Sequence, residues 1–267
     1  MRRFVRLALC LCLTLSPVMA SAGDGRRMLG DAEARAFHAV GRLNIAGSRF
    51  CTATLIAPDR VLTAAHCLYH PRTRRAVPLR MLKFVAGLRR GGYAAVRRVA
   101  RAATPTDYVY DGGARLETVR ADLALLQLDR PIRENAVSPL AVGAPARRGE
   151  AQALVSYARD RAHAPSIERA CRVRSQIGPV DALDCETTFG ASGAPVVIGD
   201  GAARRVAAIV SASARGPRDE PLSLTVEALR RLPELERRLA AGEDGMRHRR
   251  PGRGAGRAGA ASLALGE

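Results

Sequence analysis

Two short strings far apart in the chain constrain its fold most. V-L-T-A-A-H-C at 61–67 places His66 at the end of an apolar strand, and G-A-S-G-A-P at 190–195 places Ser192 in a glycine-rich turn. A serine hydroxyl is a weak nucleophile near neutral pH unless an imidazole accepts its proton and an acid orients that imidazole. Asp122, which opens the apolar run at 122–128, is the candidate acid. If the three act together, the fold must unite them.

These strings, in the order His, Asp, Ser, resemble the chymotrypsin/trypsin-like serine proteases. The family's T-A-A-H-C is matched letter for letter, D-[IL]-A-L-L as D-L-A-L-L, and G-x-S-G-x-P as G-A-S-G-A-P. Taken singly, each residue has a plainer interpretation: a structural histidine, a capping aspartate, a turn serine. The resemblance implies an all-β fold of two antiparallel six-stranded barrels with a C-terminal helix. It implies a serine endopeptidase whose catalytic residues are His66, Asp122 and Ser192, in the cleft between the barrels.

The resemblance also implies further site residues. The backbone amides of Gly190 and Ser192 would form the oxyanion hole. Glu186 stands where trypsin-like members carry an acid at the floor of the specificity pocket, which predicts cleavage after Arg or Lys; the alternative is a solvated loop residue. Ser211 and Ser213 lie in V-S-A-S, which resembles the segment that pairs with the substrate backbone, and Ser213 would narrow the pocket entrance.

Ala191 departs from the family pattern. Digestive members carry an aspartate there, which pairs with a new N-terminal amine after activation cleavage, and alanine cannot form that ion pair. R-R-M-L-G at 26–30 nonetheless resembles, faintly, the R-I-V-G-G activation site. We expect activity that does not require a new terminus at Met28.

Residues 1–22 are typical of a secretory signal peptide. Three arginines precede an apolar core at 7–15, and Ala20-Ser21-Ala22 forms a small-x-small cleavage site. The apolar run is too short to span a membrane. We therefore expect cleavage after Ala22, a secreted or periplasmic protein, and no stable membrane anchor.

Four cysteines remain after the predicted cleavage: Cys51, Cys67, Cys171 and Cys185. Export makes disulfides the expected state, and four cysteines allow three pairings. The resemblance favours Cys51–Cys67, and Cys171–Cys185 then follows. No C-x-x-C pair is present in the sequence, so neither a metal site nor a cofactor is expected.

Composition divides the chain into five parts, of which the predicted signal peptide at 1–22 is the first. We expect a flexible segment at 23–36, a first barrel at 37–144 with His66 and Asp122, a second barrel with Ser192 and a C-terminal helix at 145–241, and a disordered Gly/Ala/Arg-rich tail at 242–267. Short apolar runs divided by turns favour barrels. Apolar spacing predicts the helix over 225–240, with Pro233 kinking it or setting its first turn.

Two other function classes stay open. The formal net charge of +18 suggests one of them, a cationic protein that binds nucleic acid or the cell envelope. The arginines are scattered, however, and tryptophan is absent, so platforms for stacking bases are not visible. The other alternative is a triad-bearing binding protein with little turnover. We expect a monomer that acts on a protein or peptide substrate, with no specific nucleic acid as partner.

Overall fold

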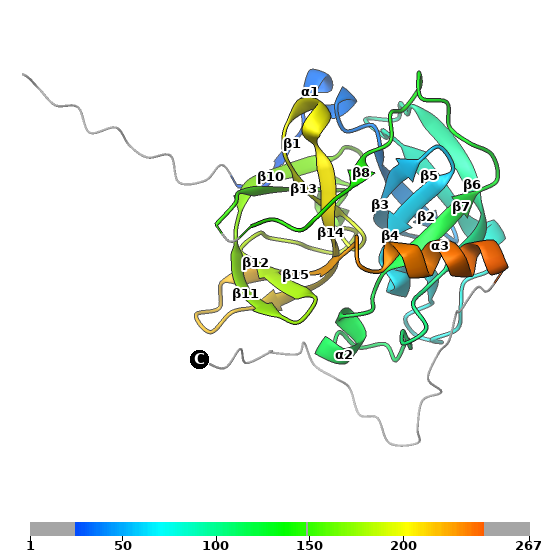
Figure 1. Cartoon of the computed structure of the whole chain (residues 1–267). Helices are drawn as coiled ribbons and strands as arrows, with labels where there is room; N and C mark the ends of the chain where they lie inside the picture. The colour runs from blue at the N-terminus through cyan, green and yellow to red at the C-terminus, as the bar shows by residue number, and fades with distance from the viewer. Residues whose placement is uncertain (1–24, 148, 243–267) are drawn as a thin grey trace, which may run out of the picture.

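The computed structural model describes residues 25–147 and 149–242. The predicted signal peptide, and the predicted tail beyond Gly242, lie outside the described residues. The described chain is mostly β, with two groups of strands and a helix, α3, that lies across the first group (Figure 1). The all-β fold class is therefore confirmed.

The first group of strands is a closed six-stranded barrel. In order around the barrel, its strands are β2 (Val40–Ile45), β3 (Arg49–Ala57), β4 (Arg60–Thr63), β7 (Ala124–Leu128), β6 (Ala95–Ala103) and β5 (Leu82–Ala86). By register, one face of four of these strands carries Leu43, Leu55, Val61 and Leu126, which are completely buried. This core fixes the ends of β4 and β7, from which His66 and Asp122 extend.

The second group contains nine strands in one sheet. Eight follow the order β1 (Arg27–Met28), β10 (Ser166–Cys171), β9 (Gln152–Ser156), β13 (Pro195–Ile198), β14 (Arg205–Arg215), β15 (Pro221–Glu227), β12 (Val180–Leu183) and β11 (Val173–Ile177). The ninth, β8 (Ala141–Val142), pairs in parallel with β14. Ser192 lies in the turn that precedes β13.

This second sheet closes through the chain itself at Arg172. Only that residue separates β10 from β11, yet β10 pairs with β9 and β11 pairs with β12, on opposite sides of the sheet. The Arg172 amide donates to Asp184 Oδ1 at 2.6 Å, and the Asp184 amide donates to the Arg172 carbonyl at 3.1 Å. With β10 and β11 as one bent strand, the second unit is a six-stranded barrel that carries β1 and β8 as additions.

The C-terminal helix is present but starts later than predicted. Residues 225–227 end strand β15, and α3 covers Leu232–Ala241 with Pro233 in its first turn. Leu235 and Leu239 are buried against the first barrel, where α3 contacts β6 and β7. The helix ends at Gly242, whose φ of 75° favours glycine.

The segment at 23–36, expected to be flexible, carries regular structure in its described part, 25–36. β1 pairs with β10, and the short helix α1 (Asp31–Arg35) follows. Leu29 is 1% exposed, and its amide donates to the Pro165 carbonyl at 2.9 Å. One buried leucine and a pair of strand hydrogen bonds anchor a segment whose composition is otherwise polar.

Both predicted disulfides are present, Cys51–Cys67 and Cys171–Cys185. The first ties β3 to the turn that carries His66. The second joins Cys171, at the end of β10, to Cys185, which follows β12. Disulfides are the state of an exported protein. Within 25–147 and 149–242, no helix has the length and apolar character needed to cross a membrane.

Replacing Leu239 with alanine tests whether α3 contributes to the core. Leu239 is 2% exposed, so the change should lower the free energy of unfolding by about 2–5 kcal/mol. Arg237→Ala on the exposed face of the same helix is the control and should change it by less than about 0.5 kcal/mol. Urea denaturation followed by circular dichroism measures both; equal losses would contradict the packing described for α3.

Candidate active site

His66 lies in η1 (Ala65–Leu68), the short 3-10 turn that follows β4. Its backbone amide donates to Asp122 Oδ1 at 2.8 Å, and its Nδ1 lies 2.7 Å from Asp122 Oδ2. A carboxylate at Nδ1 favours the tautomer with the proton there. Nε2 is therefore left as the basic nitrogen of the ring.

Asp122 lies between α2 (Leu116–Val119) and β7, and it is 3% exposed. Besides the two bonds from His66, its Oδ2 accepts a hydrogen bond from Ser211 Oγ at 2.5 Å. Ser211 belongs to β14 of the second barrel. The carboxylate is thus held from both barrels. Ser211 was expected to bind substrate, and its hydrogen bond to Asp122 was not indicated by the sequence.

The two ionisable groups shift each other's pKa. Burial alone lowers the pKa of His66, but the Asp122 carboxylate outweighs burial and holds that pKa above its ordinary value. Burial alone raises the pKa of Asp122, but His66 and the hydrogen bonds from His66 and Ser211 hold it below its ordinary value. The pair therefore favours an ionised acid beside a strongly basic imidazole.

Ser192 is tied to the first barrel through Thr52, a residue that sequence analysis missed. The Thr52 amide donates to the Ser192 carbonyl at 2.8 Å, and Thr52 Oγ1 donates to the Gly190 carbonyl at 2.9 Å. Thr63 Oγ1, at the end of β4, in turn donates to the Thr52 carbonyl at 2.8 Å. The serine turn is thereby fixed against the strand that leads to His66.

The serine turn depends on glycine at two positions. Gly190 has a φ of 95°, and a Cβ there would come within 2.3 Å of the Phe50 ring. Gly193 has a φ of 79°, and a Cβ there would lie 2.2 Å from the Thr52 carbonyl oxygen. No other residue fits either place without moving backbone or core. Glycine is required at both positions because the turn lies close to β3.

Two peptide groups of this turn have fixed orientations. The Phe189 carbonyl accepts a hydrogen bond from the Arg159 amide at 2.7 Å, and the Ala191 carbonyl accepts one from the Ala194 amide at 2.9 Å. In a planar trans peptide the C=O and N–H point in opposite directions. The N–H groups of Gly190 and Ser192, the two expected oxyanion donors, therefore point away from those partners.

The other two expected pocket residues, Glu186 and Ser213, make their hydrogen bonds to groups outside the His66–Asp122 pair. Glu186 is exposed, and its amide donates to a Glu168 carboxylate oxygen at 3.0 Å. Burial raises the pKa of Glu168 above its ordinary value, although that amide hydrogen bond opposes the shift. The structure leaves the Glu186 carboxylate in contact with solvent, so its place at a pocket floor stays a prediction.

Three hydroxyl groups gather next to Glu186. Ser213 Oγ lies 2.9 Å from Thr187 Oγ1, and Ser223 Oγ lies 3.0 Å from the same Thr187 oxygen. Ser223 Oγ also donates to the Cys185 carbonyl at 2.6 Å. Sequence analysis singled out Ser213 but missed its two partners, because nothing in the letters places them together. We call Thr187, Ser213 and Ser223 the hydroxyl cluster.

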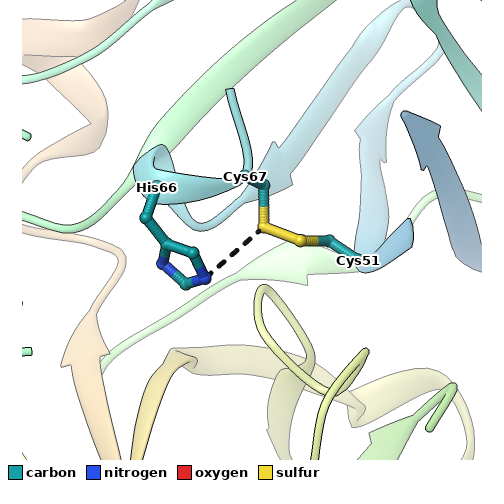
Figure 2. Close-up of side chains that lie close together, drawn as sticks. All are labelled: Cys51, His66 and Cys67. Carbon is teal, nitrogen blue, oxygen red and sulfur yellow. Dashed lines mark hydrogen bonds between the residues drawn. A yellow bond between two sulfur atoms is a disulfide. The ribbon is translucent and has the colours of Figure 1, made fainter. Parts of the chain in front are cut away.

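One group of Cys and His side chains lies close enough to suggest a metal ion. The ligand atoms of Cys51, His66 and Cys67 lie within 4.8 Å of one another, and His66 Nε2 is 3.9 Å from Cys67 Sγ (Figure 2). Both sulfur atoms are joined in the disulfide, so neither can act as a thiolate ligand. The proximity is a consequence of the bridge beside the histidine turn.

Comparison with known proteins identifies the class. A family model described as Trypsin matches residues 30–226, and the chain therefore belongs to the trypsin family of serine endopeptidases. The chain is also similar to a solved Glu endopeptidase in complex with MPD, at 16% identity and a TM-score of 0.67, covering 82% of this chain and 98% of that one.

A thermostable serine protease, AL20, from an extremophilic microorganism is a further structural neighbour. It is 14% identical with a TM-score of 0.56, and the match covers 72% of this chain and 92% of that chain. At such identities, both likenesses concern the fold. They agree with the two-barrel architecture described above.

Replacing Asp122 with asparagine tests what sets the His66 pKa. The variant keeps the shape of the side chain but removes the charge, so burial should then dominate and move the His66 pKa below about 6.5. NMR titration of the imidazole signals measures the midpoint. In the wild type it should lie above that value, and Asp129→Asn should leave it unchanged. A midpoint unaffected by Asp122→Asn would contradict the assigned pairing.

Proposed function

We propose that this protein is a secreted serine endopeptidase in which Ser192 is the nucleophile, His66 the general base and Asp122 the orienting acid. One observation carries the proposal: the Asp122 carboxylate, 3% exposed, accepts two hydrogen bonds from His66 and one from Ser211. A buried carboxylate beside an imidazole costs stability unless it is well paired. Its role in orienting a catalytic base accounts for that arrangement.

In the proposed mechanism, Ser192 Oγ attacks the carbonyl carbon of the substrate while His66 Nε2 accepts the serine proton. The N–H groups of Gly190 and Ser192 stabilise the tetrahedral oxyanion, and one such donor contributes about 3 kcal/mol to lowering the barrier. His66 then protonates the leaving amine as the C–N bond breaks. Water, deprotonated by His66, hydrolyses the acyl-enzyme and restores the serine.

Turnover is favoured over the alternative of a binding protein with little activity. That alternative would be supported by a distorted oxyanion turn, whereas both peptide groups of the turn are held by hydrogen bonds. The two disulfides fit export, and we propose that residues 1–22 are removed as a signal peptide after Ala22. We further propose that the enzyme acts as a monomer on proteins or peptides, without specific nucleic-acid binding.

Ser192→Ala tests the nucleophile. The purified mature protein should react with a fluorophosphonate probe and hydrolyse peptide amides, and the variant should lose both activities because no other group supplies the attacking oxygen. Ser48→Ala, at an exposed turn, is the control and should behave as the wild type. Probe labelling that persists in Ser192→Ala would remove the hypothesis.

Two observations point to different specificities. The Glu186 carboxylate is exposed, as an acid in a wet pocket would be, and it favours Arg or Lys before the scissile bond. The hydroxyl cluster favours a substrate carboxylate instead, which would accept the Ser213 hydroxyl proton that the Thr187 carbonyl accepts at 3.0 Å in this structure. We propose the Arg/Lys preference first. The second candidate rests on the hydroxyl cluster and agrees with the name of the Glu endopeptidase neighbour.

A peptide library with every residue before the cut separates these candidates. If Glu186 selects the substrate, Arg and Lys rank first, and Glu186→Gln lowers kcat/KM for them by about 10- to 100-fold, the worth of a charge-assisted contact. Thr187→Val is the matched control and should spare that ranking. A library led by Glu or Asp, and abolished by Thr187→Val, would instead establish the hydroxyl cluster as the selecting group.

A further inference from the structure

The described N-terminal strand is linked to the serine turn through the connection between β9 and β10. This connection contains η3 (Arg159–Arg161). We propose that Arg26 is a positioning residue, which holds η3 so that η3 in turn orients the peptide group carrying the Gly190 N–H. The proposal rests on the proposed function and adds an intramolecular activating contact to it.

Arg26 is an unusual residue for a polar entry segment because its side chain is 8% exposed. Its Nη2 donates to Asp160 Oδ2 at 2.8 Å, and the Arg161 guanidinium donates to the Arg26 carbonyl oxygen. Nε and Nη1 of Arg26 are buried without a hydrogen-bond partner in the described part of the chain. Asp160 is therefore the carboxylate that hydrogen-bonds this buried cation, and the Glu168 carboxylate also interacts with its charge.

η3 holds the serine turn from its other side. The Arg159 amide donates to the Phe189 carbonyl at 2.7 Å, and the Arg159 guanidinium lies 4.4 Å from the centre of the Phe189 ring. Phe189 is 71% exposed, so its ring is not fixed by core packing. The contacts from Arg159 are the restraints that this part of the turn receives from the second barrel.

The restraint matters because of the planarity of the 189–190 peptide. Its carbonyl oxygen points to the Arg159 amide, so its N–H, which belongs to Gly190, points the other way. Gly190 has a φ of 95° and the backbone freedom of glycine, so this peptide can rotate if it is released. A rotated peptide would turn a carbonyl oxygen, instead of a donor, toward the oxyanion.

This arrangement offers a substitute for the ion pair that Ala191 cannot form. The contact of Arg26, just before β1, with Asp160 takes the place of a contact between a newly formed amine and an acid at position 191. Cleavage after Arg27 would break the chain inside β1 and detach Arg26 from the rest of the protein. Such a cut should lower activity, which is the opposite of activation by a new terminus.

Arg26→Ala in the mature protein tests the proposal. Because the lost contact acts through an oxyanion donor, kcat for a peptide amide should fall at least tenfold while KM changes less than threefold. The affinity for a peptide boronic acid, which forms a tetrahedral adduct with the serine, should fall in parallel with kcat. Arg26→Lys keeps the charge and should recover part of the loss.

Arg27→Ala is the matched control. Arg27 is the next residue, and its guanidinium pairs with Glu33 at 2.7 Å. Its removal should leave kcat within twofold of the wild type. Thermal melting confirms that each variant is folded. If Arg26→Ala does not fold, Asp160→Asn, which keeps the shape of a half-exposed side chain, serves the same comparison.

Each outcome decides between the hypotheses. Equal kcat in wild type and folded Arg26→Ala, a rise in KM alone, or equal losses in Arg26→Ala and Arg27→Ala would overturn the positioning role and leave the proposed function intact. A wild type that neither labels with a fluorophosphonate nor turns over substrate would overturn the proposed function and the positioning role together.

Discussion

The active site depends on one threonine that joins the two barrels. Thr52 belongs to β3 of the first barrel, yet its amide and its hydroxyl donate to the Ser192 and Gly190 carbonyls of the second. Its own hydroxyl also accepts the Tyr157 amide at 2.9 Å. These bonds are local and directional, so they set Ser192 at a fixed distance from the strand that leads to His66. The glycines of the turn permit this approach because side chains there would collide with β3.

Asp122 is the second point where the barrels meet, and it connects packing with chemistry. Its carboxylate is removed from water, which by itself favours protonation. The charge of His66 reverses that tendency, together with three hydrogen bonds, one of them from Ser211 on the other barrel. The docking of the barrels therefore adds to the ionisation of Asp122 that His66 favours from the first barrel.

The sequence predicted the strings that carry chemistry better than the contacts that hold them. The pairing of His66 with Asp122 could be predicted because local letters in a fixed order are specific, and both disulfides followed from the family resemblance that those letters carry. The start of α3 could not, since Leu222, Leu224 and Val226 alternate as in a strand, and pairing with β12 and β14 decides the outcome at 225–227. Thr52 and Arg159 hold the serine turn partly through backbone amides, which any residue type supplies, and their side-chain contacts join segments far apart in the sequence, so no local pattern marks them.

The N-terminal segment illustrates the same limit. Its composition is polar, and the strand that orders it, β10, is distant in the sequence, so no local pattern announces the pairing. Two residues, Leu29 and Ala34, supply the apolar burial. Composition describes average behaviour, whereas two buried side chains and a few ladder bonds can order a short segment.

Three of the arginines have a structural role that the net charge alone does not indicate. Three of the five phenylalanines, Phe37, Phe50 and Phe189, lie under the guanidinium groups of Arg204, Arg42 and Arg159. A planar guanidinium can stack on a ring while its edge still donates hydrogen bonds, which a lysine ammonium cannot do. These stacks add to the contacts between aromatic rings that Tyr69 makes with Tyr108 and Tyr110. Two of them lie at the serine turn, since Phe50 contacts Gly190 and Phe189 precedes it. The charge at these positions belongs to the scaffold of the active site, which weakens the argument that it exists to bind a polyanion.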